Sequence, residues 1–403
     1  MYINKRFFSN LLNLGSVEVL GLLIPIITMP LLTRGLGEDL YGTYLYLLTF
    51  SLFANTVIDF GTNIVAVRTV SEFKGKKEKL YKLFNDTQSL RLILALTYIS
   101  AVCGFFYIFG DVSKITYVIA LIVPYCIGYA LIPTWYYHGL SELKLITISQ
   151  LFIKVLNLLY ILFFLSGQED FLFLLLTYSI SVLALGLYFT IYLRYKEKQR
   201  FRFTFKIVET LKSNLPVFIG LLAPNFYNTL PTIALGTIYP PAQFALLAVA
   251  IRLCSIVVII QNVVSRALYP LLIQESILKV GKLLQLYTCI SLPLIIFISV
   301  FGTTFLEIFL GQSYGGVTYY LVILSIGVMF LGWTNALSQG YFLVKGMDTV
   351  YRNVSLRVSL VACVLSFLLI HMYGILGGAL SITIARVLFF VDYYVMYKIN
   401  ENK

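Results

Sequence analysis

The chain has 403 residues, of which 59% are hydrophobic and only 12% are charged. Soluble proteins carry about 25% charged residues, so this composition excludes a water-soluble globular protein and makes lipid much of the solvent. The formal net charge of +12 is concentrated in short basic clusters between apolar runs, which predicts orientation in a membrane rather than a surface that binds nucleic acid.

Twelve apolar runs predict an all-α polytopic membrane protein with twelve transmembrane helices, because a chain in lipid must satisfy its own backbone hydrogen bonds. The first run follows Lys5 and Arg6, and we interpret it as a retained helix rather than a signal peptide. In the first half the runs lie at about 10–33, 41–66, 88–109, 115–137, 146–166 and 171–193. In the second half they lie at about 214–238, 243–265, 283–303, 315–343, 353–372 and 375–397.

Lys and Arg residues are distributed unevenly between the two sets of connecting segments. Of the 30, we assign 25 to the set that includes both termini and the basic segments Arg68–Arg91 and Arg194–Lys212. The opposite set holds only Arg34 and Lys114. By the positive-inside rule, this asymmetry predicts that both termini lie in the cytoplasm.

The two halves of the sequence resemble each other. The segment Gly21–Pro25 recurs as Gly220–Pro224, at an offset of 199 residues, on the first predicted helix of each half. We therefore predict a parallel, MATE-like pseudo-two-fold repeat, in which transporters bind substrate between the halves and rock them to alternate access. The predicted six-helix lobes are residues 1–200 and 201–403.

Proline recurs in the first predicted helix of each half. Each proline removes a backbone donor and bends a membrane helix, and bent helices at corresponding places often line a cavity or move. The residues that we predict to act as hinges are Pro25, Pro30, Pro224 and Pro231.

Charged residues inside the predicted spans are expensive in lipid and usually face a protein interior or a wet cavity. Three basic residues, Lys154, Arg252 and Arg386, predict a cationic cavity for an anionic substrate, and we add Arg34 to this group. Arginine suits phosphate oxygens because of its planar fork. The acidic residues either pair with these cations or carry protons or ions for coupling; they are Glu18, Asp59 and Asp392.

Polar and aromatic residues in the spans are candidates for contacts with sugars. The tyrosines Tyr136, Tyr137 and Tyr227 are candidates to stack on sugar rings. Asn225 and Asn228 are candidates to bind hydroxyl groups, with interhelical hydrogen bonding as the alternative.

Several types of chemistry lack their sequence signature. The five cysteines show no metal-ligand spacing, and the two histidines, His138 and His371, are far apart in sequence. No phosphate-binding P-loop occurs. We expect no metal site, no cofactor and no enzymatic activity.

Five segments are similar to one known group of membrane proteins. They are the turn Pro30–Tyr44, with an LG-x-x-x-YG pattern; Asp59–Asn63 at the end of the second span; Ile132–Leu140 at the exit of the fourth; Lys154; and Ala250–Arg252 in the eighth. Together they resemble the polysaccharide-export branch of the multidrug/oligosaccharidyl-lipid/polysaccharide (MOP) exporter superfamily, especially Wzx-type O-antigen flippases. In the seventh span, Thr229–Pro231 stands where that group often has an acidic residue, so the resemblance does not extend to ion coupling there.

The resemblance implies a flippase that carries an undecaprenyl-diphosphate-linked oligosaccharide, such as an O-antigen repeat unit. It implies movement from the cytoplasmic to the outer leaflet of the bacterial inner (plasma) membrane by alternating access. Membrane lipid, a coupling H⁺ or Na⁺, and a polymerase and chain-length regulator are the implied partners.

Two alternatives remain. A multidrug-type exporter, or one for another lipid-linked precursor, belongs to the same superfamily, and a drug exporter should prefer acidic cavity residues. A membrane polysaccharide polymerase or ligase is expected to carry a sizeable outer loop, and the predicted outer loops are short.

Overall fold

The computed structural model describes residues 5–109, 112–195, 201–205, 207–275 and 280–401. Within these ranges it leaves out the side chains of residues 5–23, 112, 143, 267, 269–271, 273–275 and 348. Every regular element in the described ranges is a helix, which confirms the all-α prediction. Nine candidate spans among the described residues are long and apolar enough to cross a membrane, so the protein is a multi-pass membrane protein.

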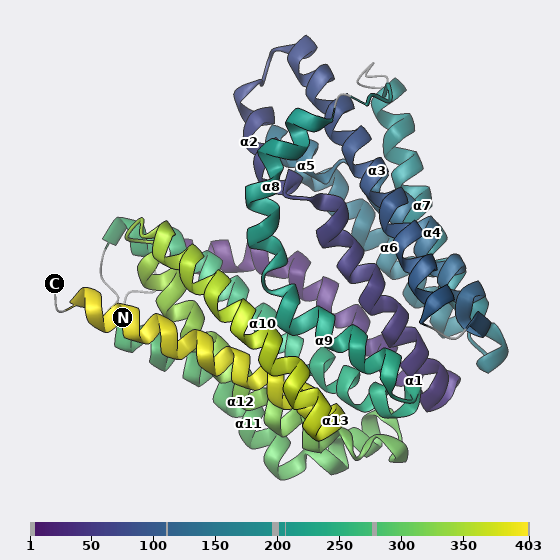
Figure 1. The fold of residues 1–403 in the computed structure, drawn as a ribbon, viewed down its shortest axis with the longest axis vertical. Helices are drawn as coiled ribbons and strands as arrows, with labels where there is room; N and C mark the ends of the chain where they lie inside the picture. Colours follow the sequence, from purple (N-terminus) through teal and green to yellow (C-terminus); the bar gives the residue numbers. More distant parts are fainter. Residues whose placement is uncertain (1–4, 110–111, 196–200, 206, 276–279, 402–403) are drawn as a thin grey trace. The chain divides into compact units, whose positions relative to one another are not determined.

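The chain forms two compact units (Figure 1). Unit 1 combines Met1–Thr43 with Ala223–Lys403, and unit 2 is Tyr44–Leu222. Helix α1 (Lys5–Asp59) therefore contributes its first part to unit 1 and its second part to unit 2. The division into two six-helix lobes, residues 1–200 and 201–403, stays a prediction.

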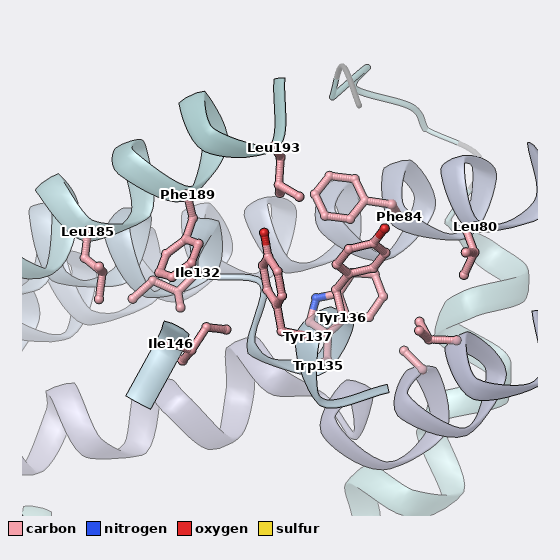
Figure 2. Close-up of a cluster of buried hydrophobic side chains, with 12 residues drawn as sticks. Leu80, Phe84, Ile132, Trp135, Tyr136, Tyr137, Ile146, Leu185, Phe189 and Leu193 are labelled. Carbon is pink, nitrogen blue, oxygen red and sulfur yellow. The ribbon is translucent and has the colours of Figure 1, made fainter. Parts of the chain in front are cut away.

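Unit 2 is built around the contact between α4 and α7, with α3 also against α4 and α5 against α2. Its core cluster surrounds Trp135, Tyr136 and Tyr137, which point into the space between Phe84 of α3 and Phe189 of α7 (Figure 2). The helices after α1 are α2 (Thr62–Glu72), α3 (Lys77–Ile108), α4 (Ile115–Leu131), α5 (Thr134–Leu140), α6 (Leu143–Phe164), α7 (Phe171–Tyr195) and α8 (Val208–Leu222).

Unit 1 is centred on α12, which packs against α10, α11 and α13. The chain reverses direction within α13 at Gly374, whose φ of 61° and ψ of −135° are not helical (Figure 1). The helices after α1 are α9 (Asn225–Ile238), α10 (Pro241–Glu275), α11 (Val280–Leu310), α12 (Val317–Leu337), the π-helical turn Ser338–Phe342, and α13 (Asp348–Glu401).

The helix breaks relate these elements to the predicted spans. Gly37, with a φ of 74°, separates the first and second predicted spans within α1, and Gly374 separates the last two. The seventh predicted span is two helices, α8 and α9, with Pro224 at the break. Proline favours a break because it lacks an N–H and disfavours helical backbone before it. The count of twelve helices and the hinge role of the prolines stay predictions.

Candidate functional site

Asp59 forms a buried polar cluster in unit 2 with residues of three other helices. Arg91 Nη1 of α3 lies 3.2 Å from Asp59 Oδ1, and the arginine side chain is only 1% exposed. The hydroxyl of Tyr129 and the amide of Asn63 both donate to Asp59 Oδ2, each at 2.7 Å. Asp59 thus ties the end of α1 to α2, α3 and α4.

This cluster corrects two expectations. Asp59 pairs with Arg91 and not with one of the three mid-span cations. Arg91 is buried inside α3 and does not lie in a cytoplasmic connecting segment. Its Nη2 also donates to the Tyr129 carbonyl oxygen at 2.9 Å. Since every described partner of Asp59 stabilises the ionised carboxylate, structural pairing accounts for this residue better than ion coupling does.

A stack of three tyrosines adjoins the cluster. The rings of Tyr129 and Tyr178 lie parallel to that of Tyr125, at centroid distances of 6.1 and 5.8 Å. The hydroxyl of Tyr125 donates to Asn55 Oδ1 at 3.0 Å. The middle of unit 2 is therefore polar and aromatic, although α4 reads as a uniformly apolar helix in sequence.

Lys154 lies near the middle of α6, in the apolar span Lys144–Phe164. Its side chain is exposed, and no carboxylate among the described side chains lies within ion-pair distance of it. A lone cation at this depth is unfavourable in lipid, and the described residues of unit 2 supply no carboxylate that pairs with it.

Unit 1 contains the other two predicted mid-span cations, Arg252 and Arg386. Arg386 of α13 packs along Gly327 of α12, where an added Cβ would come within 3.3 Å of Arg386 Cδ. Its Nη1 atom is buried and has no hydrogen-bond partner. Arg252 of α10 is half-buried, and neither arginine forms an ion pair with a described carboxylate. Unit 1 therefore also holds cations that its described residues leave uncompensated.

The predicted sugar-contacting residues lie in different environments. Tyr136 and Tyr137 are 6% and 2% exposed in the core cluster (Figure 2), so they pack the unit and do not present a face to a sugar. Tyr227 is also buried and lies against Phe389, with ring centroids 5.3 Å apart. Asn225 and Asn228 lie on α9, half-buried, and Asn225 Oδ1 accepts a hydrogen bond from Thr229.

The remaining predicted charges lie apart from these groups. Asp392 is bound by Arg357, whose Nε donates to Oδ2 at 3.0 Å. Arg34 is exposed and donates from Nη2 to the carbonyl oxygen of Ile308 at 2.7 Å, near the end of α11. A cation is favourable at this helix end because the last carbonyl groups are unpaired. The side chain of Glu18 lies outside the described residues.

The LG-x-x-x-YG segment has a clear structural reason within unit 1. Gly37 provides the left-handed backbone at the break in α1, and Gly42 approaches α10 so closely that a Cβ would lie 2.0 Å from the Pro241 carbonyl oxygen. Tyr41 is fully buried against Tyr314, with ring centroids 6.4 Å apart. Burial raises the pKa of Tyr314, so its hydroxyl stays neutral.

Sequence reasoning missed Arg91 and Tyr129. Arg91 stands at the boundary of an apolar run, where hydropathy alone assigns it to water. The signal that was available is helical spacing: Thr87, Gln88 and Arg91 share one face of α3, and all three are buried. No group of three His, Cys, Asp or Glu side chains capable of holding a metal ion lies together in the described part of the chain.

Comparison with known proteins assigns the family. The family model described as "Polysaccharide biosynthesis protein" matches residues 7–275. The chain belongs to this family. It is 24% identical over 393 residues to a Shigella dysenteriae protein named as an O-antigen transporter, covering 94% of this chain and 97% of that one. It is 25% identical over 339 residues to the capsular polysaccharide biosynthesis protein CapF of Staphylococcus aureus, covering 78% of this chain and 83% of that one.

Solved structures identify the fold of this family member. The lipid II flippase MurJ, in an inward closed conformation, matches with a TM-score of 0.77 at 14% identity, covering 95% of this chain and 87% of that one. An inward-facing MATE multidrug transporter of the MOP superfamily matches with a TM-score of 0.64 at 15% identity, covering 95% and 99%. These likenesses confirm the MATE-like fold expected from the sequence.

Proposed function

We propose that this protein is a flippase that moves a polyprenyl-diphosphate-linked oligosaccharide, such as an O-antigen repeat unit, from the cytoplasmic to the outer leaflet. The observation that carries the proposal is the set of uncompensated cations within the spans: Lys154 in unit 2 and Arg252 and Arg386 in unit 1. Such charges persist in a membrane protein when a cargo or a wet cavity needs them. A diphosphate is a cargo group that these side chains suit, since guanidinium groups bind phosphate oxygens in pairs.

The family and fold support this reading without fixing the cargo. The named relatives concern O-antigen transport and capsular polysaccharide biosynthesis, and MurJ, whose fold this chain shares, is a lipid II flippase. A drug exporter of the same fold is the second candidate, since MATE transporters also match. The basic character of the mid-span charges favours an anionic cargo over a cationic drug.

Several finer points belong to the same proposal. We place the protein in the bacterial inner membrane with both termini in the cytoplasm, because most of the Lys and Arg residues outside the predicted spans fall in the segments on that side. Two six-helix lobes, residues 1–200 and 201–403, would alternate access, with undecaprenyl as the lipid carrier. We also propose H⁺ or Na⁺ coupling, and a polymerase and chain-length regulator as pathway partners. No covalent step is required of the protein.

The test uses a strain that lacks the protein. Vesicles from this strain are treated with a membrane-impermeant enzyme that modifies glycans, which reports the leaflet of the lipid-linked oligosaccharide. We expect complete single repeat units to accumulate on the cytoplasmic face. Complete units on the outer face that fail to polymerise would instead indicate a polymerase or ligase.

Variants then test the cations. Lys154→Ala and Arg252→Ala are expected to abolish complementation of surface glycan while the protein still inserts. Lys154→Arg retains the charge and should retain activity. Lys144→Ala is the matched control, because Lys144 is exposed at the beginning of the same span. Normal surface glycan in both alanine variants would remove the cationic binding role.

A further inference from the structure

Unit 1 contains an apolar groove whose lining includes none of the predicted cationic residues. It has a volume of about 330 Å³, within the range of about 300–1,000 Å³ that is usual for ligand pockets. Helix α11 forms one wall, and α12 and α13 contribute one aromatic side chain each. The lining residues are Leu284, Gln285, Thr288, Cys289, Trp333 and Phe390.

Two polar groups that line the groove form a hydrogen bond with each other. The indole N–H of Trp333 donates to Thr288 Oγ1 at 2.8 Å. The Trp333 ring packs against Phe390, with centroids 5.1 Å apart, and against Phe330 at 5.0 Å. Because the indole and the hydroxyl satisfy one another, the floor presents mainly hydrocarbon. The groove therefore suits an apolar chain rather than a sugar.

The position of the groove along α11 indicates its depth. Leu284 and Cys289 lie within the first three turns after Val280, which is about 6–14 Å along the axis at about 1.5 Å per residue. In the proposed orientation, α11 begins on the cytoplasmic side. The groove then lies at the depth of the inner-leaflet acyl region, since the apolar core is about 30 Å thick.

A buried cation lies one helical turn away. Arg386 and Phe390 are four residues apart on α13 and share one face of the helix. Arg386 Nη1 is buried without a hydrogen-bond partner. A phospholipid keeps its headgroup at the membrane surface and has no use for a guanidinium at mid-depth. A polyprenyl diphosphate in transit brings its diphosphate to that depth while its tail stays in hydrocarbon.

We propose that this groove binds the diphosphate-proximal isoprene units of the cargo lipid, with Arg386 facing the diphosphate. The inference rests on the proposed flippase function and adds to it a tail-binding site within unit 1. The groove would hold the lipid while its headgroup crosses, so the carrier chain contributes to recognition alongside the sugar.

Cys289 provides a direct test, because it is the only cysteine of the five that is exposed. The purified protein in nanodiscs is treated with N-ethylmaleimide, and the alkylation rate is followed at Cys289 by peptide mass spectrometry. Cys103, half-buried in unit 2, serves as the internal control. Undecaprenyl diphosphate at about ten times its Kd should slow Cys289 alkylation by about tenfold, since about a tenth of the sites stay free. The rate at Cys103 should not change.

Other probes separate the lipid carrier from its parts. Inorganic diphosphate and phosphatidylglycerol should leave the Cys289 rate unchanged. Equal protection by phosphatidylglycerol would overturn the proposal, since the groove would then hold an ordinary membrane lipid. If inorganic diphosphate slowed Cys289 alkylation as much as undecaprenyl diphosphate does, the proposal would also be overturned, because the lipid tail would then play no part in the protection.

A transport measurement distinguishes failure of the groove from failure of the function. Cys289→Trp fills the groove and is expected to reduce translocation in vesicles at least severalfold, whereas Cys289→Ser should translocate like the unmodified protein. If Cys289→Trp inserts and translocates normally, the groove proposal is wrong while the flippase function stands. If the unmodified protein does not translocate lipid-linked oligosaccharide, the proposed function itself fails.

Discussion

Replacing Arg91 by methionine is expected to destabilise unit 2 by about 3 kcal/mol. Removing one partner of a buried ion pair costs about 3–5 kcal/mol, because the other charge stays buried without compensation. Here Arg91 is 1% exposed and Asp59 is 17% exposed. Tyr129 and Asn63 continue to donate to the carboxylate in the variant, so we expect the lower end of that range.

The assay is a double-mutant cycle of Arg91→Met and Asp59→Asn, with the free energy of unfolding measured in bicelles. The double variant should be more stable than Arg91→Met alone, because no unpaired charge is left buried, and the coupling energy should be about 2 kcal/mol. The control cycle uses the exposed pair of Arg68 and Glu72 in α2, where we expect less than about 0.5 kcal/mol. Additivity within about 0.5 kcal/mol at Asp59 and Arg91 would refute the reasoning.

Three glycine substitutions give further predictions. Gly42→Ala should destabilise unit 1 by about 1–3 kcal/mol, measured as above, because the new Cβ meets the Pro241 carbonyl oxygen at 2.0 Å. Gly104→Ala, with nothing within 4 Å, should be neutral or slightly stabilising, and a comparable loss there would point to a general helix effect. Gly327→Val should push α13 away at Thr383 and Arg386, which an added Cβ would approach to 3.0 and 3.3 Å, and lower translocation severalfold while insertion stays normal. Unchanged translocation would argue against a role for that part of α13.

The apolar runs predicted most of the architecture. Length and composition were enough to indicate helices in a membrane, because lipid leaves a single chain few other ways to satisfy its backbone. The chain departs from helical backbone at Gly37 and begins a new helix after Pro224, whereas Pro25, Pro30 and Pro231 lie inside helices. Counting along the sequence also placed Lys154 near the middle of a span, where the structure has it.

The apolar pattern could not predict which side chains contact each other between helices. Asp59 and Arg91 are 32 residues apart, and the apolar boundary in α3 suggested water around the arginine. Tyr136 was a candidate for sugar binding because an interfacial tyrosine and a core tyrosine look the same in sequence. Only the packing of α5 against α2 and α3 buries it.

The sequence by itself determined that this is a helical membrane protein of the polysaccharide biosynthesis family, with three cations at mid-span. These properties depend on local composition and spacing, so they can be predicted without knowing which residues lie in contact in the folded protein. The tertiary structure alone decided which charges are compensated: Arg91 and Arg357 neutralise Asp59 and Asp392, whereas Lys154 and Arg386 form no ion pair with a carboxylate among the described residues. The physical reason is that compensation depends on distances of a few ångströms between helices far apart in the chain, and hydropathy contains no such information.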